Sequence, residues 1–313
     1  MVLAIAALLI LPAALTLRSV LHPVVLQPTS SNPTPFGYTW SLLLFLVPIA
    51  GLAWWFSSRP DLQFPRAAFW RTIAVLAPLG FALDLLFGNS FFIFPNEQAT
   101  LGLRVPALGG GIPIEEFIFY LTGFILVLLS YVWCDEYWMA AYNVPDYAEA
   151  AKGMPRIVRF HGASLLVGAV LIAAAVIYRR FFSGNAAGFP WYFIYLCAAS
   201  FVPSIGFFKT ARDFINWRAF SFSFFLILLI SLLWEATLAL PYGWWDYRAV
   251  AMMGLPIGAW ANLPLEAPCV WIAVTFTTVI VYEVIKIWKA LGTRALAAFF
   301  GVGAPLDAAI ARR

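Results

Sequence analysis

Long apolar stretches separated by short polar segments make up most of the chain. Eight stretches can be distinguished: 2–17, 38–57, 69–88, 113–134, 160–178, 190–208, 218–240 and 263–286. About 20 apolar residues are enough for an α-helix to cross the hydrocarbon core of a bilayer. The pattern therefore predicts an all-α membrane protein with about eight transmembrane helices. For 2–17 we favour a helix over a signal peptide, because no basic residue precedes the apolar run.

Composition supports this class and excludes several others. Of 313 residues, 63% are hydrophobic and 11% are charged, and the mean hydropathy is +0.87, which excludes an ordinary soluble domain. The isolated cysteines 134, 197 and 269 indicate neither a disulfide framework nor a paired-cysteine metal site. With only two histidines and no nucleotide-binding motif, we expect no metal, no cofactor and no nucleic-acid partner.

Basic residues concentrate in alternate loops and at the C-terminal end. They are Arg59, Arg66, Lys152, Arg156, Arg159, Lys209, Arg212, Lys286, Lys289, Arg294, Arg312 and Arg313. The positive-inside rule places these segments in the cytoplasm and the long loops 89–112 and 241–262 outside. Arg179 and Arg180 fall outside, against the rule. We expect an integral, multi-pass protein of a bacterial inner or plasma membrane.

An internal repeat organises the apolar stretches. A single offset of 151 residues aligns Asp84 with Glu235, Pro113 with Pro264, and Glu115 with Glu266. Such a register indicates duplication. It divides the chain into an N-terminal helix and loop (1–37), a first three-helix unit (38–136), a loop and linking helix (137–189), a second unit (190–288) and a cytoplasmic tail (289–313). The single linking helix makes the two units parallel.

Acidic residues lie within or beside the apolar stretches. The candidate catalytic residues are Asp84, Glu115, Glu116, Glu235 and Glu266. An ionisable group at the bilayer centre costs about 2.5–3.5 kcal/mol on insertion scales, so such groups usually serve a function. The alternative is that Glu115 and Glu116 only complement a helix dipole. Since Glu116 aligns with Ala267, we expect Glu115 to be the general acid and Glu116 to be an orienting or helix-capping group.

Aromatic side chains accompany these acids. The candidate substrate-binding residues are Phe94, Phe117, Tyr120, Trp234, Trp244, Trp245 and Trp271. Their π-faces can stabilise a cation, although Trp and Tyr also mark membrane interfaces. A carboxyl group in an apolar pocket is a candidate general acid. Together these features predict protonation of an apolar substrate inside the membrane.

The sequence resembles the integral-membrane carotenoid (lycopene) cyclase family, whose bacterial, archaeal and fungal members are two three-helix subunits or a fusion of both. The resemblance rests on Pro113-Ile114-Glu115-Glu116-Phe117, on Asp84 and on Asn262-Leu263-Pro264-Leu265-Glu266, and covers both units. It implies an isomerase (intramolecular lyase) that closes rings at the ψ-ends of lycopene or a related linear carotene without a cofactor. The implied partners are the linear carotenoid, membrane lipid and other enzymes of carotenoid biosynthesis.

Two other classes remain open. Glu115-Glu116 also begins the motif of CAAX-type intramembrane endopeptidases, but Tyr120 stands where that motif has arginine. An isoprenoid-binding or transport protein would suit the parallel repeat equally well. Detection of a changed product separates an enzyme from a binder.

Overall fold

The computed structural model describes residues 34–59, 64–184 and 187–301, together with 10, 13–15, 17–18 and 21. In this part of the chain, seven helical segments are long and apolar enough to cross a membrane. They are α2–α3 (Gly37–Ser41 and Leu43–Ser57), α4 (Arg66–Phe91), α5 with η2 (Ile114–Trp133 and Cys134–Trp138), α7 (Gly162–Phe181), α8 (Trp191–Ala211), α9 with η4 (Trp217–Trp234 and Glu235–Ala239) and α10 (Glu266–Leu291).

These segments confirm the apolar stretches from 38–57 onward as helices, with ends displaced by a few residues. The long elements are α-helical and suit a multi-pass membrane protein. The stretch 2–17 lies mostly outside the described residues. The remaining short helices are η1 (Glu97–Ala99), η3 (Ala140–Tyr142), α6 (Tyr147–Ala150), η5 (Gly258–Trp260) and α11 (Ala295–Phe300).

Local sequence explains several helix ends. Asn216 caps α9, because its side chain accepts a hydrogen bond from the backbone N–H of Ala219. Gly292 ends α10 in the left-handed region, with φ of 64°, which glycine adopts without steric cost. The ends of α5 and α9 widen into the π-helical turns η2 and η4. Such turns are rare and are often found at functional sites.

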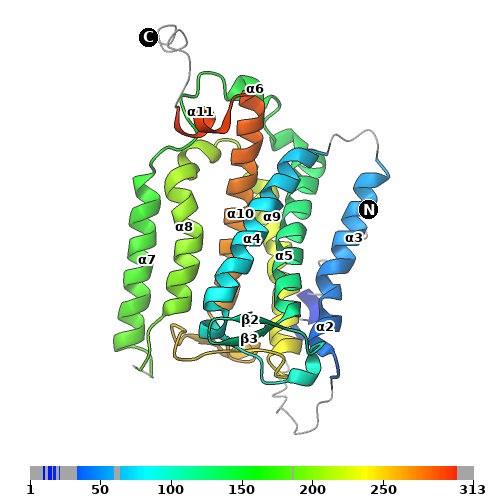
Figure 1. Ribbon diagram of the computed structural model, residues 1–313, viewed down its shortest axis with the longest axis vertical. Coiled ribbons are helices and arrows are strands. Elements are labelled where there is room, and N and C mark those ends of the chain that lie inside the picture. The colour runs from blue at the N-terminus through cyan, green and yellow to red at the C-terminus, as the bar shows by residue number, and fades with distance from the viewer. Residues whose placement is uncertain are drawn as a thin grey trace.

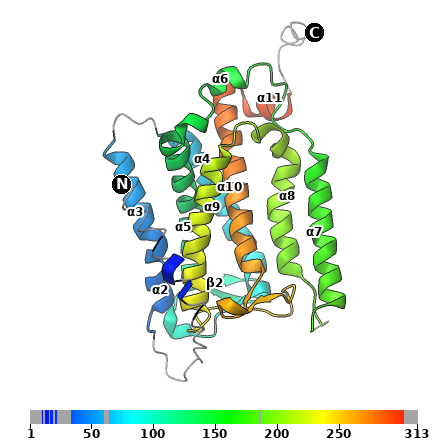
Figure 2. The same cartoon turned by 180° about the vertical axis from the view of Figure 1, so that it is seen from behind.

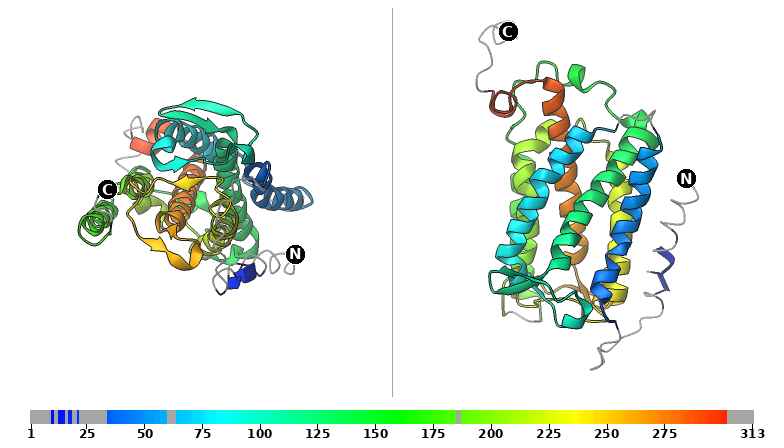
Figure 3. Two further views of the ribbon diagram at one scale, coloured as in Figure 1. Left: turned by 90° about the horizontal axis from the view of Figure 1, so that it is seen from below. Right: turned by 45° about the vertical axis from the view of Figure 1, so that its right-hand side comes forward.

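Helix α10 stands near the centre of the bundle and packs against α4, α5, α8 and α9 (Figure 1). Seen from behind, α9 lies in front of α10, on the opposite side from α4 (Figure 2). The view along the bundle shows α7 outside α8 and α3 outside α5 (Figure 3). We call the end that carries strands β2 and β3 the hairpin end, and the end that carries α6 and α11 the far end.

Three antiparallel strand pairs cover the hairpin end, where the sequence predicts only loops. Strand β1 (Phe92–Ile93) pairs with β4 (Asp246–Tyr247), β2 (Arg104–Ala107) with β3 (Gly110–Pro113), and β5 (Pro256–Ile257) with β6 (Leu263–Pro264). In register, Arg104 lies opposite Pro113, and Pro256 lies opposite Pro264. The helices that carry Glu115 and Glu266 near their first residues, α5 and α10, therefore begin just after a strand pair.

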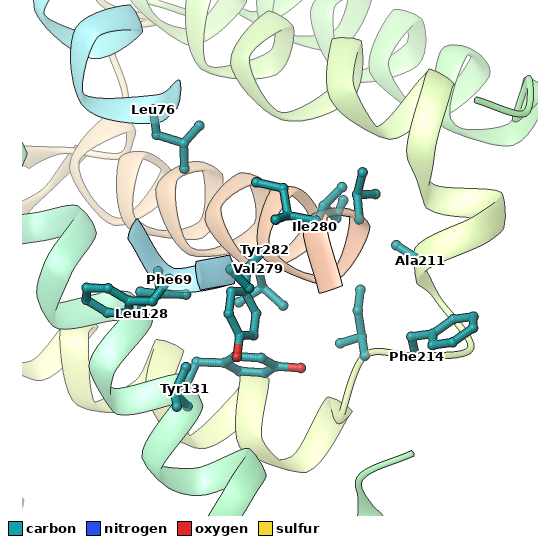
Figure 4. Packing of buried hydrophobic residues seen from close by; sticks show 14 of the residues in the cluster. Phe69, Leu76, Leu128, Tyr131, Ala211, Phe214, Val279, Ile280 and Tyr282 are labelled. Carbon is teal, nitrogen blue, oxygen red and sulfur yellow. The ribbon is translucent and has the colours of Figure 1, made fainter. Parts of the chain in front are cut away.

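The far end has an apolar core that joins α4, α5 and α10 to the segment around 211–215 (Figure 4). A polar cluster adjoins this core. The buried Glu283 accepts hydrogen bonds from Tyr131 (2.8 Å) and Tyr147 (2.6 Å). Burial raises the pKa of Tyr147, so this phenol stays a hydrogen-bond donor. Lys286 Nζ forms a salt bridge with Asp135 Oδ2 at 3.3 Å. The cluster thus connects α6, which contains Tyr147, to α5 and α10.

Arg179, one of the two arginines that depart from the positive-inside rule, is buried in the protein. Its side chain is 2% exposed and donates to the carbonyl oxygens of Ala187 and Ala249. A Cβ atom at Gly254 would lie 2.7 Å from the guanidinium, so this close approach requires a glycine. Arg179 therefore connects the loop that contains Ala187 to the loop that contains Ala249, and its charge is not exposed to lipid or water.

Candidate functional site

A small pocket with a cavity volume of about 40 Å³ lies between α5, α9 and α10 at the hairpin end. It contains two carboxyl groups, those of Glu116 and Glu235. Its aromatic lining consists of Phe92, Phe119, Tyr120, Phe124, Tyr192, Trp234, Trp245, Tyr247 and Trp271. Gly123, Val270 and Val274 complete the walls. A mostly apolar cavity with a few convergent polar groups is the usual form of a small-molecule site.

Glu235 is held by three hydrogen-bond donors. It is the first residue of the π-helical turn η4 and is 3% exposed. Ser231 donates to Oε1 at 2.7 Å, Trp271 Nε1 donates to the same oxygen at 3.2 Å, and the Tyr247 hydroxyl donates to Oε2. An ionised carboxylate accepts hydrogen bonds and donates none, so three donors suit the anionic form of this group.

Tyr247 lies on strand β4, outside the membrane-spanning helices. Burial and the neighbouring Glu235 carboxylate raise the pKa of the Tyr247 phenol well above its ordinary value. Both causes disfavour a second negative charge at this place. The phenol therefore remains neutral and keeps donating its proton to Glu235 in a hydrogen bond.

Glu116 faces the same pocket with a different partner. The hydroxyl of the fully buried Tyr38 donates to Glu116 Oε2, and this is the only hydrogen bond to the Glu116 side chain among the described residues. The ring of Tyr38 packs against Trp245, with ring centroids 4.8 Å apart. Glu116 and Glu235 are near enough to interact electrostatically. One pocket thus contains a buried carboxyl group with three hydrogen-bond donors and a second one with a single donor among the described residues.

Asp84 lies beside the pocket rather than in its wall. It is 3% exposed and interacts electrostatically with Glu116. Its Oδ2 atom has no hydrogen-bond partner among the described residues. A Cβ atom at Gly88 would lie 2.5 Å from Asp84 Oδ1, so the glycine leaves room for this carboxyl. Asp84 is therefore positioned to influence Glu116 through its charge.

Glu115 does not line the pocket; its side chain instead anchors the loop that precedes α5. Its Oε1 atom accepts hydrogen bonds from the backbone N–H of Leu101 at 2.7 Å and from the Thr39 hydroxyl at 2.6 Å. Glu266 holds the corresponding loop of the second half, because its Oε1 accepts from the backbone N–H of Met253. Neither side chain lines the pocket. The two glutamates that align in the sequence thus make the same kind of contact.

A second pair of contacts strengthens this correspondence. The backbone N–H of Ile114 donates to the carbonyl of Leu103 at 2.9 Å, and that of Leu265 donates to the carbonyl of Leu255 at 3.0 Å. Ile114 and Leu265 are 151 residues apart, as are Glu115 and Glu266. The loop before α5 and the loop before α10 are therefore anchored in the same way.

Trp234 is the centre of the aromatic wall. Its ring centroid lies 4.2 Å from that of Trp245 and 4.5 Å from that of Phe119. Its Nε1 atom donates to Ser41 Oγ at 2.7 Å, which fixes the orientation of the indole. Trp271 meets Phe119 edge to face at 5.6 Å. Hydrogen bonds thus hold two indole rings in place beside the two carboxyl groups.

Four of the seven predicted substrate-binding residues line the pocket: Tyr120, Trp234, Trp245 and Trp271. The other three lie elsewhere. Phe117 packs edge to face on Phe81, and Trp244 donates to Thr34 Oγ1. Phe94 packs against a cluster of buried apolar residues that includes Phe91, Phe92 and Trp245.

The residues at the pocket that the sequence does not predict include Tyr38, Phe119, Phe124 and Tyr192. Phe119 lies three residues after Glu116 and so shares its helix face, a spacing that was available as a signal. Tyr38 comes from a helix 78 residues earlier and carries no motif that links it to Glu116.

No family model, no curated protein and no solved structure matches this chain. In the described part of the chain, no group of three His, Cys, Asp or Glu side chains is arranged to hold a metal ion. His161 lies at the start of α7 beside Ser164 and does not line the pocket.

Proposed function

We propose that this chain is a membrane carotenoid cyclase that closes a ring at the ψ-end of lycopene or a related linear carotene by acid–base catalysis. The observation that carries the proposal is the joint presence of Glu116 and Glu235 in one aromatic pocket. An apolar polyene fits such a wall, and its protonation needs one carboxyl group that gives a proton and a second group that takes one. The sequence motifs point to the same class of reaction.

In this mechanism Glu116 is the proton donor. Its proton adds to the terminal double bond of the substrate and leaves a tertiary carbocation. The neighbouring double bond attacks this carbon and forms the ring bond, which moves the positive charge into the new ring. The π-faces of Trp234, Trp245 and Trp271 stabilise the charge. The structure thereby favours Glu116 as the acid over Glu115, whose carboxyl group is bound to Leu101 and Thr39.

Glu235 completes the cycle as the base. Its three donors hold a carboxylate in place, and that anion stabilises the cation before it accepts the ring proton. Loss of this proton forms the ring double bond, so the product is an isomer of the substrate. Return of the proton from Glu235 to Glu116 restores the starting state. Substrate, product and protein balance without an oxidant or a co-reactant.

We further propose that the chain contains two parallel three-helix repeats, 38–136 and 190–288. The matching anchors at Glu115 and Glu266 support this division. Glu116 then comes from the first repeat and Glu235 from the second, so the pocket forms where the repeats meet. Ala267 stands where the second repeat would need a counterpart of Glu116. One pocket, rather than two, is the expected result.

Under the same proposal the hairpin end faces the outside of a bacterial plasma membrane. The substrate reaches the site from the membrane lipid, and other enzymes of carotenoid biosynthesis supply the linear carotene. An isoprenoid-binding or transport role is the alternative. An intramembrane protease is less well supported, because Tyr120 lies in the pocket wall where the protease motif has arginine.

Expression in a bacterium that accumulates lycopene tests the proposal. The wild-type chain should convert lycopene into an isomer of equal mass with one double bond fewer for each ring formed, and Glu116→Gln should not. Membranes treated with chelator and given no nucleotide should keep the activity. Recovery of unchanged lycopene bound to the purified protein would instead establish a binding protein.

A further inference from the structure

A second cleft lies at the far end of the bundle, away from the pocket that contains Glu116 and Glu235. Its cavity volume is about 850 Å³. Small-molecule sites commonly measure about 300–1,000 Å³, so this cleft is large enough for a ligand. Residues of α3, α4, α5 and the α3–α4 connection line it, and the proposed reaction gives it no role. We call it the far-end cleft.

The inner part of the far-end cleft is apolar. Helix α5 forms its floor through Ile125 and Leu129, which are four residues apart and therefore lie on one face. Helices α3 and α4 each pack against α5 and form the two walls, to which they contribute Phe56 and Phe69. Figures 1 and 3 show α5 between these two helices. All three helices are apolar enough to cross a membrane, so the cleft suits a lipid acyl chain.

The mouth of the far-end cleft is basic. Arg59 follows the end of α3, Arg66 is the first residue of α4, and both exposed side chains line the cleft. In the described part of the chain neither arginine forms a salt bridge, whereas the exposed Arg212 at the same end does. The segment 59–66 contains one acid, Asp61, which lies outside the described residues. With two arginines and one aspartate, the segment keeps a net positive charge.

The start of α4 adds to the positive charge at this mouth. Pro65 precedes the helix and provides no side-chain cap, and the first turn contains no acidic residue. Anions stabilise the positive end of a helix dipole, whereas Arg66 adds a like charge there. A bound phosphate group would remove this repulsion, because it suits both a helix N-terminus and a guanidinium group.

We propose that the far-end cleft binds one anionic phospholipid. The phosphate group lies between Arg59, Arg66 and the first turn of α4, and an acyl chain packs over Ile125 and Leu129. Trp70 also lines the cleft and is 60% exposed, as is common for tryptophan at the level of lipid headgroups. An uncharged carotene would leave both arginines unpaired. The site shares no residue with the pocket at the hairpin end, so it does not depend on the proposed catalysis.

Titration of the purified, delipidated full-length chain with lipid tests the headgroup, with bound lipid counted by native mass spectrometry. Phosphatidylglycerol should bind about tenfold more tightly than phosphatidylcholine with the same acyl chains, because basic residues at the membrane surface attract anionic lipids. The double variant Arg59→Gln/Arg66→Gln should lose this preference. The control Lys209→Gln/Arg212→Gln removes the same charge from exposed positions at the same end that do not line the cleft, and it should keep the preference.

A second pair of variants tests the acyl chain. Ala53 is exposed and lines the cleft, so Ala53→Trp should fill it and weaken binding of both lipids about tenfold. Gly51 lies about 160° around the same helix, and a Cβ atom there meets nothing within 4 Å among the described residues. Gly51→Trp should therefore bind within about twofold of the wild type. If Ala53→Trp does not fold, Ala53→Leu and Gly51→Leu replace the pair.

Three results would overturn the proposal. They are equal binding of the two lipids by the wild type, an unchanged preference in Arg59→Gln/Arg66→Gln, and equal effects of the substitutions at Ala53 and Gly51. Displacement of bound phosphatidylglycerol by excess inorganic phosphate would also overturn it, since the site would then recognise phosphate and not a lipid. Each measurement is made without carotene, so failure here leaves the cyclase proposal standing, and failure of the cyclase proposal leaves the lipid site standing.

Discussion

The contrast between Glu115→Gln and Glu116→Gln tests the central assignment most directly. The two residues are adjacent, share a helix and are both buried, yet only Glu116 lines the pocket. Glutamine keeps the shape of glutamate and removes the transferable proton. Loss of a general acid typically slows a reaction by about 10²–10⁴-fold. At about 1.36 kcal/mol per tenfold, this raises the barrier by about 2.7–5.4 kcal/mol in Glu116→Gln.

Glu115→Gln has a different expected effect. Glutamine retains a carbonyl oxygen that can accept from both Leu101 and Thr39, so the loop anchor survives. Replacing a charged acceptor by a neutral one weakens each bond and costs on the order of 1 kcal/mol of stability. We expect turnover within about tenfold of the wild type.

The assay is pigment analysis after expression in lycopene-accumulating cells, followed by initial rates in isolated membranes. Glu97→Gln is the control, because the Glu97 side chain is 77% exposed and does not line the pocket. Carotene binding is measured in parallel and should stay near normal in all three variants. Full activity of Glu116→Gln together with an inactive, folded Glu115→Gln would refute the assignment of the acid.

Three further predictions follow from particular contacts. Arg179→Met should lower the free energy of unfolding by about 2–4 kcal/mol, because hydrogen bonds to charged groups contribute about 1.5–3 kcal/mol each. The control Arg212→Met, at an exposed site, should change the free energy of unfolding little, and thermal unfolding in detergent measures both variants. The raised pKa of Tyr247 contributes stability that is complete below pH 10.0 and is lost at higher pH, as the unfolded phenol ionises first. The stability difference between wild type and Tyr247→Phe should therefore shrink above that pH, and a constant difference would contradict the reasoning. In a background without native cysteines, an impermeant thiol reagent should label Leu108→Cys only from outside and Leu296→Cys only from the cytoplasm; both residues are well exposed, and the reverse result would invert the assigned orientation.

The helices could be predicted because a bilayer imposes a local requirement. Each crossing must satisfy its own backbone hydrogen bonds and present about 20 apolar residues, and both properties are visible in an uninterrupted stretch of sequence. The strand pairs at the hairpin end could not be predicted in this way. Strand β1 pairs with β4, which lies in the other half of the chain, and each is only two residues long.

The sequence also determined which residues were candidates for chemistry. Carboxyl groups in apolar stretches are costly, so Asp84, Glu116 and Glu235 stand out from the pattern of residues alone. The alignment of Glu115 with Glu266 was informative as well, because both glutamates anchor equivalent loops. The inference from that alignment to catalysis does not follow, since a repeated structural contact produces the same register in the sequence as a repeated catalytic group.

Tertiary structure decided which of two adjacent glutamates meets the pocket. Successive residues of a helix point about 100° apart, so the rotation of α5 against its neighbours selects between Glu115 and Glu116. That rotation depends on the packing of α3, α9 and α10 and on contacts such as the one from Tyr38, 78 residues earlier in the chain. A sequence pattern records the spacing of side chains along one helix, whereas the direction in which each side chain faces is determined by the helices packed around it.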